Sequence, residues 1–153
     1  MRDSLVQPGT SPFCSKQDYL KFIQPFAFTK NPIIELLDVL KEYNLHFGYR
    51  VVNEISRFIW TAKELVHNFN LNTAMDIQVL QKILPKFHGT QAKLKYPLEK
   101  MLAFCYGPNV PFDEELLSKA GQYNKEARYP RTAQKLARMI HNLKTQGYTS
   151  FIE

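Results

Sequence analysis

The chain has 153 residues, enough for one domain with a buried core, and it carries a net charge of +6. Hydrophobic residues make up 44% of it and charged residues 22%, a balance that argues against disorder driven by charge. Because no apolar run approaches the roughly 20 residues of a membrane span, and the first residues lack a signal peptide's apolar segment, we expect a cytoplasmic protein with no membrane partner.

Residues 1–30 are predicted to form an irregular lead-in or linker, because Pro8 and Pro12 interrupt its start, with one short helix over SKQDYLKF. A longer helix is predicted to begin at Asn31-Pro32, since asparagine caps helices and proline fits the first helical position. Its apolar stripe would consist of Ile33, Leu36, Leu37 and Leu40.

The next helix is predicted from about Tyr49 to His67, after a bend that Gly48 permits. Its buried face would consist of Val52, Ile55, Ile59, Ala62 and Val66. Another helix is predicted from Asn72-Thr73, with Thr73 and Asp76 in a capping-box arrangement, and Pro85 and Gly89 would close it. Its stripe would consist of Ile77, Leu80, Ile83 and Leu84.

Three further helices are predicted in the last third of the chain. The first has a stripe through Leu94 to Cys105, and Pro97 either starts its regular part or kinks it. Asp113 would cap a short helix through Lys119, and the last helix would begin near Pro130 and end at Gly147. The tail YTSFIE would be a short strand or an extended strap. Residues 31–153 therefore predict one all-α domain, an irregular bundle of about five to six helices.

Positive charge is concentrated toward the C-terminus. Residues 123–153 hold six basic residues against Glu126 and Glu153, hence +4 of the total of +6. A surface for nucleic acid or a partner protein would use Arg128, Arg131, Lys135, Arg138 and Lys144. The aromatic residues interleaved with these cations are Tyr123, Tyr129, Tyr148 and Phe151. The alternative is that these cations only form a helix face exposed to solvent and bind no partner.

Residue patterns of complete catalytic sites are missing. No two glycines have the spacing of a P-loop, and neither HExxH nor GxSxG occurs. VPFDEE (110–115) imitates a Walker-B strand weakly, but Pro111 favours a loop that leads into a helix cap. Cys14 or Cys105 beside a histidine would be a nucleophile pair, whereas core packing is the ordinary role of such a cysteine. The cysteines and histidines lack the spacing of a zinc site, so we expect no metal site. Because the catalytic patterns are also missing, we expect no enzyme activity from this chain by itself.

Three segments, in this order along the chain, resemble parts of one family. FGYRVVNEISRFI (47–59) is similar to the sensor-2 segment of AAA+ ATPases of the McrB-like kind. FNLNTAMDIQVLQKILPKFHG (69–89) resembles the next lid helix of that group, and YPRTAQKLARMIHNLKTQGYTSF (129–151) its C-terminal helix and tail. The resemblance covers most of residues 31–151 and includes no nucleotide-binding core.

This resemblance implies a helical lid that packs over a separate α/β core domain, which would bind ATP or GTP with Mg²⁺. Arg50 matches the sensor-2 arginine that reaches toward the phosphates, with Glu54 to orient it and Arg131 as a second candidate. The implied partners are the core domain, neighbouring ring subunits, and in a restriction assembly a nuclease subunit and DNA. The alternative for Arg50 is a simple helix pair with Glu54 four residues on. For the whole chain, the alternatives are a small basic nucleic-acid-binding module and an interaction bundle unrelated to nucleotides.

Overall fold

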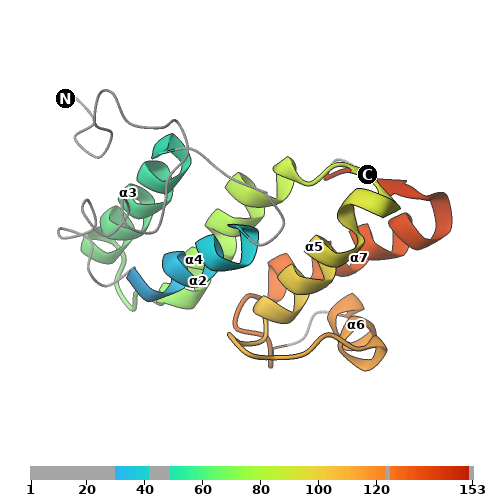
Figure 1. Cartoon of the computed structure of the whole chain (residues 1–153). Helices are drawn as coiled ribbons and strands as arrows, with labels where there is room; N and C mark the ends of the chain where they lie inside the picture. The colour runs from blue at the N-terminus through green and yellow to red at the C-terminus, as the bar shows by residue number, and fades with distance from the viewer. Residues whose placement is uncertain (1–29, 42–48, 123–124, 152–153) are drawn as a thin grey trace. The chain divides into compact units, whose positions relative to one another are not determined.

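The computed structural model describes residues 30–41, 49–122 and 125–151, and it is mostly helical (Figure 1). Six α-helices lie in these residues: α2 (Lys30–Lys41), α3 (Tyr49–Leu65), α4 (Leu71–Gln78), α5 (Gln91–Phe104), α6 (Glu114–Gly121) and α7 (Pro130–Gln146). A π-helical turn, η2 (Val79–Ile83), and a 3₁₀ turn, η3 (Leu84–Lys86), continue α4. The two strands, β1 (Gly89–Thr90) and β2 (Tyr148–Thr149), are short, so the predicted all-α class is confirmed.

The chain divides into two compact units, residues 1–74 and 75–153. The division falls inside α4, within the stretch 31–153 that the sequence assigns to one domain. The predicted lead-in lies almost entirely outside the described residues, as does its short helix over SKQDYLKF. None of the described helices is both long enough and apolar enough to cross a bilayer.

The first unit contains α2 and α3, whose amphipathic patterns were predicted. In α2 the four residues of the predicted stripe are buried: Ile33, Leu36, Leu37 and Leu40. In α3, Ile55 and Ile59 are fully buried, but Leu65 at the end of the helix is 78% exposed and Val66 is 54% exposed. The prediction that Val66 belongs to the buried face of α3 was therefore wrong.

The segment α4–η2–η3 departs from the sequence prediction at both its start and its buried face. The helix begins at Leu71, and Asn70 rather than Thr73 caps it, because the Asn70 Oδ1 accepts a bond of 3.1 Å from the Thr73 N–H. Met75, Val79, Ile83 and Leu84 are buried, whereas the predicted Ile77 and Leu80 are half-buried. A π turn adds one residue to the helical repeat, so the buried face changes phase at η2.

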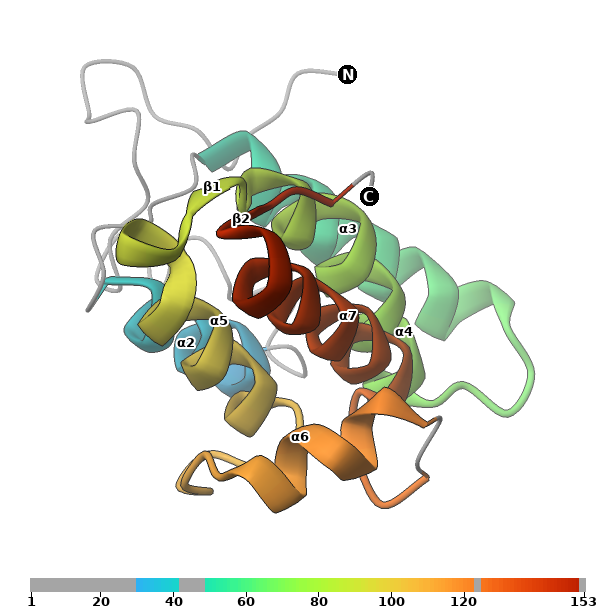
Figure 2. The ribbon, with the colours of Figure 1, turned by 90° about the vertical axis from the view of Figure 1, so that its right-hand side faces the viewer.

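The second unit is organised around α7, which contacts α5, α6, η2 and β2 (Figures 1 and 2). Its first helical residue is Pro130, and Gly147 ends it with φ 83°, a left-handed conformation that glycine adopts without strain. Its buried face consists of Thr132, Ala133, Leu136, Ala137, Met139, Ile140 and Leu143. β2 follows at once and pairs antiparallel with β1, so the tail begins as a strand.

The remaining helices of this unit follow their local signals. α5 already begins at Gln91, so Pro97 lies inside the helix, where it is buried with Leu94, Leu98 and Met101. At α6, the predicted cap is confirmed, because the Asp113 Oδ1 accepts a bond of 2.7 Å from the Leu116 N–H. The weak Walker-B imitation therefore belongs to a loop and a helix start, and residues 110–113 form no strand.

Candidate functional site

Arg50 lies in the first turn of α3, and its side chain is 89% exposed. Its Nε is 3.9 Å from the Oε1 of Glu54, one helical turn along. At that distance on an exposed surface, an ion pair of this kind contributes at most about 0.5 kcal/mol. The pair therefore leaves the Arg50 guanidinium accessible to an anion from outside the chain.

The first turn of α3 is also electropositive in its own right. No acidic residue lies in this first turn, so the helix itself places no carboxylate against the positive end of its dipole. Arg50 adds a full charge next to the amide groups that have no partner within the helix. This end of α3 therefore favours the approach of a negatively charged group.

The basic residues of α7 fall on two different sides of the helix. Arg131, Lys135 and Arg138 are spaced by four and three residues, which places them on one face, opposite the buried residues. Arg131 and Arg138 are exposed and Lys135 is half-buried. We call these three residues the α7 basic face. Lys144 lies elsewhere, and its Nζ is 2.9 Å from the Oε1 of Glu114 in α6.

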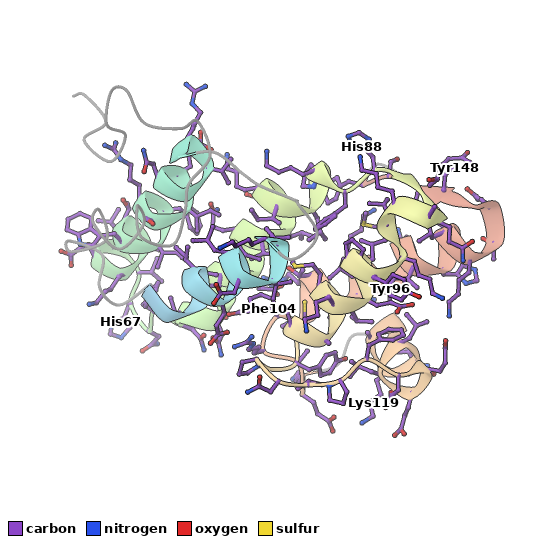
Figure 3. All side chains as sticks on the ribbon, viewed as in Figure 1. His67, His88, Tyr96, Phe104, Lys119 and Tyr148 are labelled. Atoms are coloured by element: carbon purple, nitrogen blue, oxygen red, sulfur yellow. The ribbon has the colours of Figure 1, made fainter. Side chains whose placement is uncertain are left out.

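Arg128, the remaining predicted cation, is bound to the C-terminal end of α5. Its Nε and Nη2 donate bonds of 3.0 and 2.8 Å to the carbonyl oxygen of Phe104. Its guanidinium lies 4.7 Å from the ring centroid of Phe104, the residue labelled at the end of α5 in Figure 3, and 5.0 Å from that of Tyr129. Such contacts satisfy a carbonyl that the helix leaves without a partner, so the structure favours a structural role for Arg128.

The N-terminus of α7 is already occupied by a carboxylate from a distant segment. Asp76 is 2% exposed, and its two carboxylate oxygens accept bonds of 3.0 and 2.8 Å from the N–H groups of Arg131 and Thr132. The Thr132 hydroxyl in turn donates a bond of 3.0 Å to the Asp76 carbonyl. A phosphate cannot use these amides while Asp76 holds them, so Arg131 can contribute only its side chain to a ligand.

The role of Asp76 was missed because the sequence suggested a local capping box. The sequence at the start of α7 does contain a signal for this contact. The residue before Pro130 is Tyr129, which has no side-chain group that caps α7, so an acceptor has to come from elsewhere in the fold.

The aromatic residues near the cations differ in exposure. Tyr129 is fully buried, so it offers no surface for stacking, while Tyr123 lies outside the described residues. Tyr148 is 49% exposed and lies with His88 near the paired strands (Figure 3). Phe151 is half-buried, and the Nζ of Lys135 lies 5.0 Å from its ring centroid. Of the four predicted aromatics, Tyr148 and Phe151 therefore have described, accessible rings.

The nucleophile and metal alternatives gain no geometric support from the described residues. Cys105 is fully buried at the end of α5, and burial raises the pKa of its thiol well above the usual value. Within 30–41, 49–122 and 125–151, no three His, Cys, Asp or Glu side chains are grouped to hold a metal ion. Cys14 lies outside these ranges.

Fold and surfaces together define an all-α chain with one exposed arginine at the start of α3 and a separate basic face on α7. The sequence profile of a domain of unknown function, DUF8727, matches residues 12–148. Because this match covers most of the chain, the protein belongs to that family. No curated protein and no solved structure matches the chain.

Proposed function

We propose that this chain is the helical lid of a McrB-like AAA+ NTPase and that Arg50 acts on the phosphates of a nucleotide held by a core domain. The observation that carries the proposal is the exposed Arg50 guanidinium in the electropositive first turn of α3. The order of the three lid-like segments along the chain and the all-α fold support it.

The chemistry of Arg50 suits this role. A guanidinium presents a planar fork of donors that binds two phosphate oxygens at once and offsets their charge. The 3.9 Å contact with Glu54 holds the side chain loosely along α3, so a phosphate with a stronger charge competes for it. When the γ-phosphate leaves, the contact between Arg50 and that phosphate is lost. The orientation of the lid therefore follows the state of the nucleotide.

The core domain would supply everything that this sequence lacks. Its P-loop would bind ATP or GTP, and its Walker-B carboxylates would hold Mg²⁺. In the proposed assembly the lid also contacts neighbouring ring subunits, and a nuclease subunit and DNA are further partners. Arg131 is the weaker candidate for the nucleotide, because Asp76 already occupies the amides at its helix start.

The test begins with the DNA upstream of the Met1 codon and the neighbouring genes, which should encode a P-loop core domain. That core would be expressed with this chain, and hydrolysis of ATP and GTP would be measured with Mg²⁺. We expect Arg50→Ala to lower turnover by about 100-fold, the usual cost of removing a positioned charged donor. Arg50→Lys should recover only part of the activity, because lysine lacks the planar fork.

Lys41→Ala is the matched control, since it removes one exposed positive charge from the end of α2 in the same unit. It should leave turnover unchanged, and circular dichroism should show equal helix content in all variants. Equal turnover of Arg50→Ala and wild type would refute the role of Arg50. A core domain whose hydrolysis does not respond to this chain would refute the lid itself.

A further inference from the structure

The α7 basic face has an unbalanced charge. α7 contains four basic and no acidic residues along its 17 positions, so no carboxylate within the helix offsets them. Neither Arg131 nor Arg138 forms an ion pair with another described residue. Lys144, at the other end of the helix, receives a carboxylate from Glu114 of α6. The fold therefore pairs Lys144 with a carboxylate, whereas the side chains of Arg131 and Arg138 stay exposed.

The cations of this face lie close enough to act on one another. Arg131 lies in the first turn of α7, where its backbone N–H donates to the Asp76 carboxylate while its side chain is exposed. Lys135 is half-buried beside Phe151, and burial, followed by the charge of Arg138, lowers the pKa of the Lys135 ammonium. An anion placed along this face would favour the charged form of Lys135.

The spacing of the three side chains suits a linear chain of phosphates. At about 1.5 Å rise per residue, the seven steps from Arg131 to Arg138 span about 10 Å along the helix axis. Phosphates of one duplex strand repeat about every 3.4 Å along its axis, so this distance corresponds to about three nucleotides. The two arginines add the donor forks that match phosphate oxygens.

We propose that the α7 basic face binds the sugar–phosphate backbone of a nucleic acid. The ring of Phe151, next to Lys135, provides an aromatic surface beside this track on which a base of a single strand can stack. The contact is made by charge and does not select a sequence. This inference does not depend on the lid function, because it involves neither Arg50 nor a nucleotide site.

The test uses the full chain and two labelled probes, a mixed-sequence DNA duplex and the matching single strand. Binding is measured by fluorescence anisotropy over a salt series. Three neutralised phosphates predict a slope of log K against log salt of about −2.7 for the duplex and about −2.1 for the single strand. The duplex affinity should therefore fall by about 40-fold between roughly 50 and 200 mM salt.

Substitutions then locate the contact. Arg138→Ala should reduce the magnitude of the duplex slope by about 0.9, and Arg131→Ala with Arg138→Ala should weaken binding by at least about tenfold at low salt. Lys144→Ala is the matched control, since it removes one charge from the same helix on the side held by Glu114. It should change the affinity by less than about twofold, because salt screens charges that lie away from the contact.

Three results would overturn the proposal. The first is the absence of binding of the wild-type chain to either probe at low salt, a measurement that needs no variant. The second is a double variant, shown to be folded by circular dichroism, that binds as wild type does. The third is equal binding to poly-glutamate of matched charge, which would assign the α7 basic face to acidic proteins. In each case the activity test of Arg50 stands unaffected.

Discussion

Asp76 holds the start of a helix that lies 55 and 56 residues further along the chain. Its carboxylate is buried, and each oxygen accepts an N–H of α7. The negative charge also meets the positive end of the α7 dipole. One side chain therefore replaces the local cap that Tyr129 cannot provide and fixes the end of α4 to the start of α7.

Asp76→Ala should lower the free energy of unfolding by about 2–4 kcal/mol, because two buried N–H groups lose a charged acceptor. Urea unfolding followed by circular dichroism would measure the loss, and hydrogen exchange should show faster exchange at the start of α7. Asp113→Ala is the comparison, since Asp113 caps α6 locally at an exposed position. Its expected cost is about 1 kcal/mol. Equal costs for the two variants would contradict the larger role assigned to Asp76.

At the scale of helices, the second unit depends on how α5 ends. The backbone carbonyl of Cys105 accepts bonds of 2.9 and 3.2 Å from the N–H groups of Arg128 and Tyr129, and the Arg128 side chain binds the carbonyl of Phe104. The segment before α7 thus closes the C-terminus of α5. The sequence marked Arg128 as one of five equivalent surface cations, and these contacts distinguish it from the others.

Arg128→Ala should therefore lower the free energy of unfolding by about 1.5–3 kcal/mol. The variant loses the hydrogen bonds that the charged guanidinium donates to the Phe104 carbonyl and the contacts with the rings of Phe104 and Tyr129. Arg128→Lys should recover only part, since an ammonium cannot reproduce the fork. Arg138→Ala, on the α7 basic face, should change stability by less than about 0.5 kcal/mol. Thermal unfolding of the three variants tests this order, and an equal cost at positions 128 and 138 would rule out the capping role.

For the whole molecule, we expect a dependence of stability on pH from the packing of α5, α6 and α7. Burial raises the pKa of Glu99, nearby Lys95 and Lys144 oppose this shift, and Glu114 adds to it. A carboxyl whose pKa is raised on folding stabilises the folded state when protonated, at pH below its unfolded value. That contribution is lost as the pH rises through the folded pKa. At neutral pH the ionised Glu99 therefore opposes folding.

Glu99→Gln should raise the free energy of unfolding at neutral pH, by no more than about 0.5 kcal/mol. The difference from wild type should shrink as the pH falls toward the ordinary pKa of a glutamate carboxyl, where the wild-type carboxyl becomes neutral as well. Urea titrations at several pH values would measure it. Glu115→Gln, at a carboxylate that is 80% exposed, is the control and should show no such convergence. If the difference in free energy of unfolding between Glu99→Gln and wild type instead grew at acid pH, the sign assigned to the Glu99 contribution would be wrong.

What the sequence determined by itself was the local structure. The apolar repeats of α2, α5 and α7, Pro130 at a helix start, Gly147 at its end and Asp113 as a cap are signals confined to a few neighbouring residues, and the structure confirms each of them. Helix formation depends on such short-range contacts, so they are visible in one sequence. The π turn at η2 was not visible, because one added residue in a helix leaves no distinct local pattern.

Only the tertiary structure decided which polar residues are structural and which remain available. Asp76 with α7, Arg128 with Phe104 and Lys144 with Glu114 are contacts across 24 to 56 residues of sequence. Charge counts treat the cations of the last helix alike. Of the five predicted surface cations, the fold binds Arg128 and Lys144 to other elements and leaves Arg131 and Arg138 exposed. That sorting depends on which surfaces the packed helices bring together, and no periodicity within one helix encodes it.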